Sequence, residues 1–157
     1  TIQTRMAEVE DKIELFLVDL ILREETTTPE QETLIEKTIA KHPDNDILIF
    51  QYAGKVAKNN PVKAREIYDG LIARDPTNAD ALYNAGVIIY NMAAEAGKDP
   101  TWLRKRDEHF LEDQMLIALG YFKRAVDLGQ KAAINPILQI ADYFGDKELH
   151  QQYSQMQ

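Results

Sequence analysis

Residues 75–86 read Asp75-Pro76-Thr77-Asn78-Ala79-Asp80-Ala81-Leu82-Tyr83-Asn84-Ala85-Gly86, and this stretch decides the fold. It indicates that one helical hairpin ends at a proline turn and that the next hairpin begins directly after it. Apolar residues recur at helical spacing along the chain, and no segment alternates with period two. The sequence therefore predicts an all-α protein.

Polar residues followed by proline mark most of the predicted helix starts. Such a residue caps the helix, and proline is tolerated at the first helical position because its missing N–H has no partner there. The four such pairs are Thr28-Pro29, Asn60-Pro61, Asp99-Pro100 and Asn135-Pro136. Together with glycine stops, they predict helices over 5–25, 29–41, 45–58, 61–74, 79–97, 100–128, 136–144 and 147–156.

The punctuation repeats at a fixed interval. Pro43 and Pro76 are 33 residues apart, and Leu48 and Leu82 are 34 apart. A period near 34 residues is typical of stacked helix pairs. Residues that fit this register in the first repeat are Leu48, Tyr52, Ala64, Tyr68, Leu71 and Pro76, and those in the second are Leu82, Gly86, Ile89, Ala118, Phe122 and Ala125.

In this register the chain resembles the tetratricopeptide repeat (TPR) family from about Asn45 to Leu128. The resemblance implies a right-handed stack of antiparallel helix pairs, an α-solenoid. One departure from the family is clear: Ile89 and Ala118 are 29 residues apart, where the family has nine. The second repeat is therefore predicted to form an elongated hairpin with about 20 extra residues.

We accordingly predict a single TPR-like domain over 1–157. Its predicted parts are an N-terminal helix pair at 1–44, a repeat at 45–78, the elongated repeat at 79–128 and a truncated C-terminal pair at 131–157. Long-insert repeats followed by a short closing pair resemble bacterial cell-envelope TPR proteins. That likeness leaves the bacterial periplasm or cell envelope and the cytoplasm as alternative locations. Because the chain starts at Thr1, we expect it to be a fragment or a processed product.

The composition excludes several classes of function. The net charge is −8, so the overall basic footprint of a nucleic-acid-binding protein is missing. The chain has no cysteine, which excludes disulfides and thiolate metal sites. The most apolar segment, 13–22, is too short and too charged to span a bilayer.

The concave face of a TPR stack is formed by the first helix of each pair, which suggests a groove for a peptide. Tyrosine and asparagine suit such a groove because they combine rigid aromatic area with adaptable hydrogen bonding. In the alternative interpretation, these side chains only pack between repeats. The predicted groove residues are Phe50, Tyr83, Asn84, Val87, Tyr90 and Asn91.

The tip of the elongated hairpin carries basic residues beside the only tryptophan. Trp102, Arg104 and Arg106 are of the residue types that most often anchor interfaces. Alternatively, Trp102 packs across the hairpin against Met92 and Ala96, and the arginines are solvated or paired with acidic neighbours.

The first helix is apolar on two faces. Met6, Val9, Ile13, Phe16 and Leu20 follow heptad spacing. Leu15, Val18 and Leu22 fall on a second face. One of the two faces can pack on the following helix, and the other would need a partner, either a second copy or upstream chain, unless packing within the chain covers both.

No pattern of catalysis is present. His42, His109 and His150 are scattered, without metal-ligand spacing, and there is no phosphate loop or nucleophile motif. His42 is expected to end a helix, and the carboxylates Glu8, Glu10 and Asp11 are expected to form a solvated face. We predict no cofactor and no metal.

The sequence therefore predicts a non-catalytic interaction or assembly scaffold. Its partner would be another protein or a peptide segment, with a homo-oligomer as a further possibility and with neither nucleic acid nor a membrane span. The alternatives are a structural module that self-associates through the apolar first helix, and the docking arm of a larger enzyme.

Overall fold

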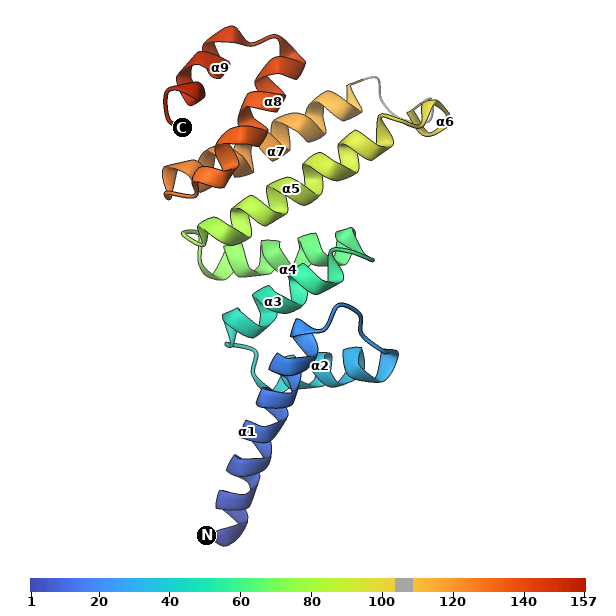
Figure 1. Ribbon diagram of the computed structural model, residues 1–157, viewed down its shortest axis with the longest axis vertical. Coiled ribbons are helices and arrows are strands. Elements are labelled where there is room, and N and C mark those ends of the chain that lie inside the picture. The colour runs from blue at the N-terminus through green and yellow to red at the C-terminus, as the bar shows by residue number, and fades with distance from the viewer. Residues whose placement is uncertain (104–108) are drawn as a thin grey trace. The chain divides into compact units, whose positions relative to one another are not determined.

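A computed structural model describes residues 1–103 and 109–157, without the side chains of Trp102 and Leu103. Within these ranges every regular element is a helix and no strand occurs, which confirms the predicted all-α class (Figure 1). The chain divides into two compact units, here called the N-terminal unit (Thr1–Val56) and the C-terminal unit (Ala57–Gln157). The boundary falls inside the repeat predicted over 45–78, and the single domain over 1–157 stays a prediction.

The N-terminal unit contains three helices. They are α1 (Ile2–Arg23), α2 (Pro29–Lys41) and α3 (Asp46–Val56). The predicted start of α2 is confirmed: Thr28 caps it, and the side chain of Gln31 reaches back to the Thr28 backbone in a capping box. Val18 of α1 and Ile35 of α2 are fully buried and form the centre of this unit.

Polar contacts hold α1 against α2. The Glu14 carboxylate accepts hydrogen bonds from Lys41 Nζ, at 2.7 and 2.8 Å, and from the buried hydroxyl of Thr38 at 2.9 Å. His42 ends α2, as predicted, and its Nε2 lies 2.8 Å from the Asp11 carboxylate. Asp11, expected on a solvated face, keeps a side chain that is 39% exposed, and it is also bound by His42, 31 residues away.

The hydrogen bond from Lys41, followed by that from Thr38, holds the pKa of Glu14 below its ordinary value. A carboxyl whose pKa is lower in the folded than in the unfolded state stabilises the folded protein. This contribution is complete above the unfolded-state pKa of about 4.3, and it is lost as the pH falls through the lower, folded-state pKa. We therefore expect Glu14→Gln to unfold at a lower temperature than wild type at pH 7. The difference should shrink as the pH is lowered below about 4.

Thermal unfolding followed by circular dichroism at several pH values measures this difference. Glu8→Gln, on an exposed turn of the same helix, is the matched control and should track wild type at every pH. A gap between Glu14→Gln and wild type that stays constant from neutral to acidic pH would contradict the assignment.

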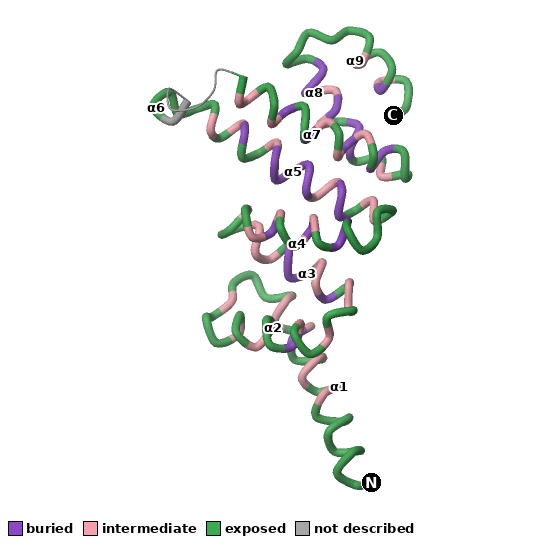
Figure 2. The backbone as a smooth tube through the Cα atoms, turned by 180° about the vertical axis from the view of Figure 1, so that it is seen from behind, coloured by how far each residue is buried: buried purple, intermediate pink, exposed green. Residues whose placement is uncertain are grey.

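The C-terminal unit places each long helix against its neighbours in sequence. Helix α5 packs on both α4 and α7, α7 packs on α8, and α8 packs on α9. The buried positions run along α5, α7 and α8 (Figure 2). The elements described are α4 (Pro61–Arg74), α5 (Ala79–Ala96), α6 (Pro100–Leu103), α7 (Phe110–Asp127), the 3-10 helix η1 (Lys131–Ala133), α8 (Ile134–Phe144) and α9 (Lys147–Ser154).

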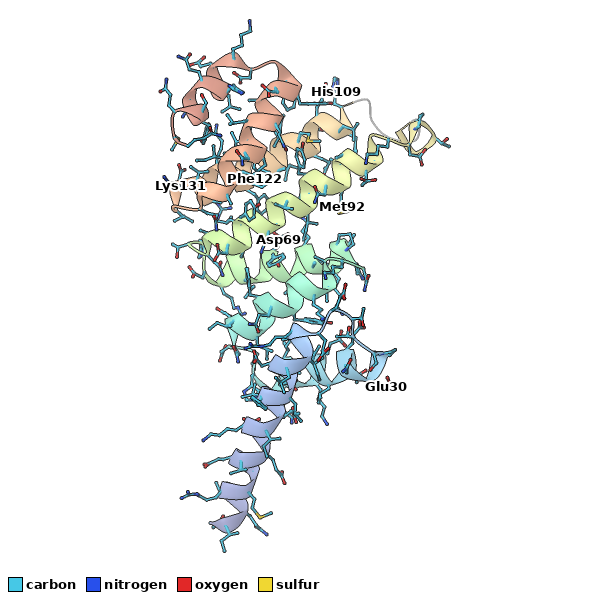
Figure 3. The ribbon with its side chains drawn as sticks, in the orientation of Figure 1. Glu30, Asp69, Met92, His109, Phe122 and Lys131 are labelled. Atoms are coloured by element: carbon cyan, nitrogen blue, oxygen red, sulfur yellow. The ribbon has the colours of Figure 1, made fainter. Side chains whose placement is uncertain are left out.

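Phe122 lies at the centre of this unit (Figure 3). It comes from α7 and is fully buried. Its ring approaches α5 at Gly86, where a Cβ atom would lie 2.8 Å from the Phe122 Cε1 atom. Glycine at this position therefore lets the two helices approach closely.

Two polar contacts join segments that are distant in sequence. The Tyr121 hydroxyl on α7 donates to the Asp69 carboxylate on α4 at 2.7 Å. Gln130, which follows α7, donates from its side chain to the Asp80 carboxylate at the start of α5. Burial, together with the nearby Asp69 charge, raises the pKa of Tyr121, so the phenol stays protonated and can donate.

Two predicted helices need correction. In place of one helix over 100–128, the structure has α6 and α7, with residues 104–108 outside the described ranges. The last part does not begin at the pair Asn135-Pro136. Instead, η1 leads directly into α8, so Pro136 stands inside the first turn, where its missing N–H costs no intrahelical bond.

Candidate interaction site on helix α5

An apolar groove runs along one side of α5. It has a volume of about 620 Å³ and is lined by six residues of α5 and by Asp99, with Ala57 and Pro61 on the opposite wall. The α5 residues are Val87, Ile88, Asn91, Met92, Glu95 and Ala96, and Asp99 lies three residues past the end of the helix. The volume is in the range of sites that hold a small ligand or a few side chains of a peptide.

The spacing of the lining residues explains why they share one wall. Val87, Asn91 and Glu95 are four residues apart, and so are Ile88, Met92 and Ala96. Residues four apart lie above one another on a helix, so two adjacent rows face the groove. The predicted start of α4 is also confirmed: Asn60 caps the helix, and Pro61 stands at its first position.

The floor of the groove is apolar and its edge is acidic. Met92 is 40% exposed although it is a large apolar side chain, and Figure 3 marks it on α5. Among the described residues that line the groove, the ionisable ones are Glu95 and Asp99, and both are acidic. Glu95 is exposed and pairs with Lys98 at 2.6 Å, while the Asp99 carboxylate accepts from the backbone N–H of Thr101 at 2.9 Å.

Two of the predicted binding residues line this groove, namely Val87 and Asn91. Two others contact neighbouring helices. The Tyr83 ring lies 6.1 Å from the Phe122 ring, centroid to centroid, and the Asn84 amide donates to the Tyr68 hydroxyl at 3.3 Å. These contacts agree with the alternative interpretation, in which such side chains pack between repeats. A role of Tyr83 and Asn84 in binding stays a prediction.

Of the remaining predicted residues, Tyr90 is not among those that line the groove. Phe50 is half-buried on α3 in the N-terminal unit, and Tyr90 is half-buried on α5. Trp102 belongs to α6, but its side chain is not described. Arg104 and Arg106 lie outside the described residues, so the predicted basic tip stays a prediction.

Sequence reasoning missed Ile88, Met92, Glu95, Ala96 and Asp99 as groove residues. The signal that could have found the last four is the i, i+4 spacing from Val87 and Ile88, carried two turns further along the elongated helix. Pro61, on the opposite wall, carries no local signal for the groove, because its place there depends on how α4 and α5 pack.

A second hollow, of about 440 Å³, lies between α8 and α9 and is lined mostly by polar residues. His150 and Asp142 both line it, and His150 Nε2 lies 3.6 Å from Asp142 Oδ1. No group of three or more metal-ligating side chains occurs in residues 1–103 and 109–157. Across the same ranges, no helix is both long and apolar enough to cross a membrane.

In class, the chain is an all-α protein with an apolar groove. No protein-family model, no curated protein and no solved structure matches it significantly. The resemblance to the TPR family therefore rests on the residues of this sequence alone.

Proposed function

We propose that this chain is a non-catalytic, TPR-like interaction scaffold that binds an apolar peptide segment of another protein in the α5 groove. The supporting observation is the groove itself, a solvent-open apolar groove of about 620 Å³ along α5, with Ala57 and Pro61 opposite. The period of 34 residues between Leu48 and Leu82, and the helices packed in sequence order, support the TPR-like arrangement.

The lining defines the chemistry of the partner. Val87, Ile88 and Met92 offer apolar contact area for one or two aliphatic or aromatic anchors. Glu95 and Asp99, in a chain of net charge −8, favour lysine or arginine beside those anchors. We therefore expect the partner segment to combine apolar anchors with a basic flank.

Selection from a phage-displayed library of random 12-residue peptides tests this proposal on the full chain. The selected peptides should be rich in apolar and basic residues. A synthetic peptide from the selection, labelled with a fluorophore, then gives dissociation constants by anisotropy. Its affinity should fall as salt is added, because rim charges are screened.

Met92→Glu is expected to weaken this peptide by at least about tenfold, since a carboxylate replaces an apolar contact and adds to the acidic edge. Leu116→Glu is the matched control, because Leu116 is 52% exposed on α7 and does not line the groove. Equal binding by wild type and Met92→Glu, or a selection that enriches no apolar-basic peptide, would overturn the proposal.

A further inference from the structure

Helix α1 has one packed face and one free face. The packed face carries Asp11, Glu14 and Val18, which contact α2 or are buried. On the other side lies a stripe of six apolar residues that are all exposed, here called the α1 stripe. Its members and their exposed fractions are Ile2 (81%), Met6 (57%), Val9 (55%), Ile13 (52%), Phe16 (62%) and Leu20 (43%).

The α1 stripe has the register of a coiled coil. The intervals between its members alternate between four and three residues, from Ile2 through to Leu20. Met6, Ile13 and Leu20 therefore occupy the a positions of three heptads, and Ile2, Val9 and Phe16 occupy the d positions. The residues that contact α2 fall at positions b and f, so the seam is directed away from the packed face.

Nothing in the described part of the N-terminal unit covers this seam. Residues 1–10 are all exposed, and this end of α1 extends past α2 (Figure 2). A helical segment without tertiary contacts is marginal in water, and its apolar stripe remains in contact with solvent. Association with another helix would bury the stripe and stabilise the segment.

The charges beside the stripe indicate which helix fits. A hollow of about 730 Å³ lies over Ile2, Met6 and Val9, and its lining includes Arg5 and Glu10. Arg5 is at a g position and Glu10 at the following e position. In a parallel pair of identical helices, a g residue faces the e residue five positions further along the partner. Arg5 of each copy therefore faces Glu10 of the other copy, which gives two ion pairs in the dimer.

An antiparallel pair fits less well. The register that matches all six stripe residues, with Met6 against Phe16 and Ile2 against Leu20 of the other copy, brings Lys12 against Lys12 and Glu10 against Glu10. Like charges in such positions are destabilising. The acidic residue that could pair with Arg5 in that arrangement, Asp19, is already bound to Arg23 at 2.8 Å.

We propose that the α1 stripe is a self-association surface that packs in parallel, in register, against the α1 stripe of a second copy of this chain. This surface shares no residue with the α5 groove, so the inference does not depend on the proposed peptide binding. The face of α1 that contacts α2 remains buried as before.

The oligomeric state of the full chain tests the proposal. Light scattering coupled to size exclusion should give at least twice the monomer mass of 18.0 kDa. Ile13→Asp should raise the dissociation constant by roughly 100-fold or more, since two buried apolar side chains become two carboxylates. The matched control is Ile117→Asp on α7, where the replaced side chain is 41% exposed, and it should leave the mass unchanged.

A wild-type chain that stays monomeric at concentrations up to about 1 mM would overturn the proposal. The free energy of association would then be weaker than about 4 kcal/mol. So would a monomer that binds vesicles of phosphatidylglycerol and phosphatidylcholine through α1. Circular dichroism of both aspartate variants checks that loss of mass does not reflect unfolding.

Disulfide formation tests the orientation cleanly, because the chain has no cysteine of its own. Ile2→Cys should form a cross-linked dimer under mild oxidation in the parallel arrangement. In the antiparallel register two such cysteines would be about 27 Å apart along the axis, beyond the reach of a disulfide. An associated protein that fails to cross-link at this position would contradict the parallel arrangement.

Discussion

Replacing Phe122 with alanine is expected to lower the free energy of unfolding of the C-terminal unit by about 3–5 kcal/mol. Phe122 is fully buried on α7, where its ring lies against Gly86 of α5 and beside the Tyr83 ring. The truncation removes the transfer free energy of the ring and leaves a cavity between helices that are already closely packed.

Urea unfolding followed by circular dichroism measures this loss. Phe144→Ala on α8 is the matched control, because that side chain is 39% exposed and its ring lies edge-to-face against that of its neighbour Tyr143. Its expected cost is about 1 kcal/mol. Similar losses for the two variants would show that Phe122 is not the centre of the packing.

Gly86→Ala is expected to destabilise by about 1–3 kcal/mol, although glycine to alanine normally stabilises a helix interior. The added Cβ would lie 2.8 Å from Cε1 and 3.0 Å from Cδ1 of the Phe122 ring. Because the ring is fully buried, it can yield only by shifting α5 and α7 apart or by leaving its rotamer.

Two exposed helical glycines give the opposite expectation. A Cβ at Gly70 of α4 or Gly120 of α7 meets nothing within 4 Å, so alanine there should stabilise by roughly 0.5–1 kcal/mol. The double variant Gly86→Ala/Phe122→Leu should cost less than the sum of the two single changes, because leucine lacks the ring atoms nearest the new methyl group. Additive costs, or a stabilising Gly86→Ala, would contradict the close approach at Gly86.

The helix starts were predictable because their signals are local. Thr28, Asn60 and Asp99 each bind a backbone N–H two or three residues further on, and the residue pair alone reveals this. The pair Asn135-Pro136 carries the same local pattern, yet α8 begins at Ile134. There, the Gln130 side chain caps η1 by accepting a hydrogen bond from the Ala132 backbone N–H, and the chain is therefore already helical before Pro136.

Long-range pairs could not be predicted in this way. His42 binds Asp11, Tyr121 binds Asp69 and Gln130 binds Asp80, over separations of 31 to 52 residues. Which polar groups meet depends on how whole helices rotate and pack. The apolar face of α1 was predictable from heptad spacing alone, whereas the α5 groove was found in part, through Val87 and Asn91.

The most direct measurement titrates the selected apolar-basic peptide into three proteins by calorimetry: wild type, Met92→Glu and Ile13→Asp. The groove and the α1 stripe share no residue, so Met92→Glu should lose peptide binding and keep the oligomeric mass. Ile13→Asp should lose the oligomeric mass and bind the peptide with unchanged affinity for each chain. Peptide binding that survives in Met92→Glu but disappears in Ile13→Asp would contradict the assignment of both surfaces.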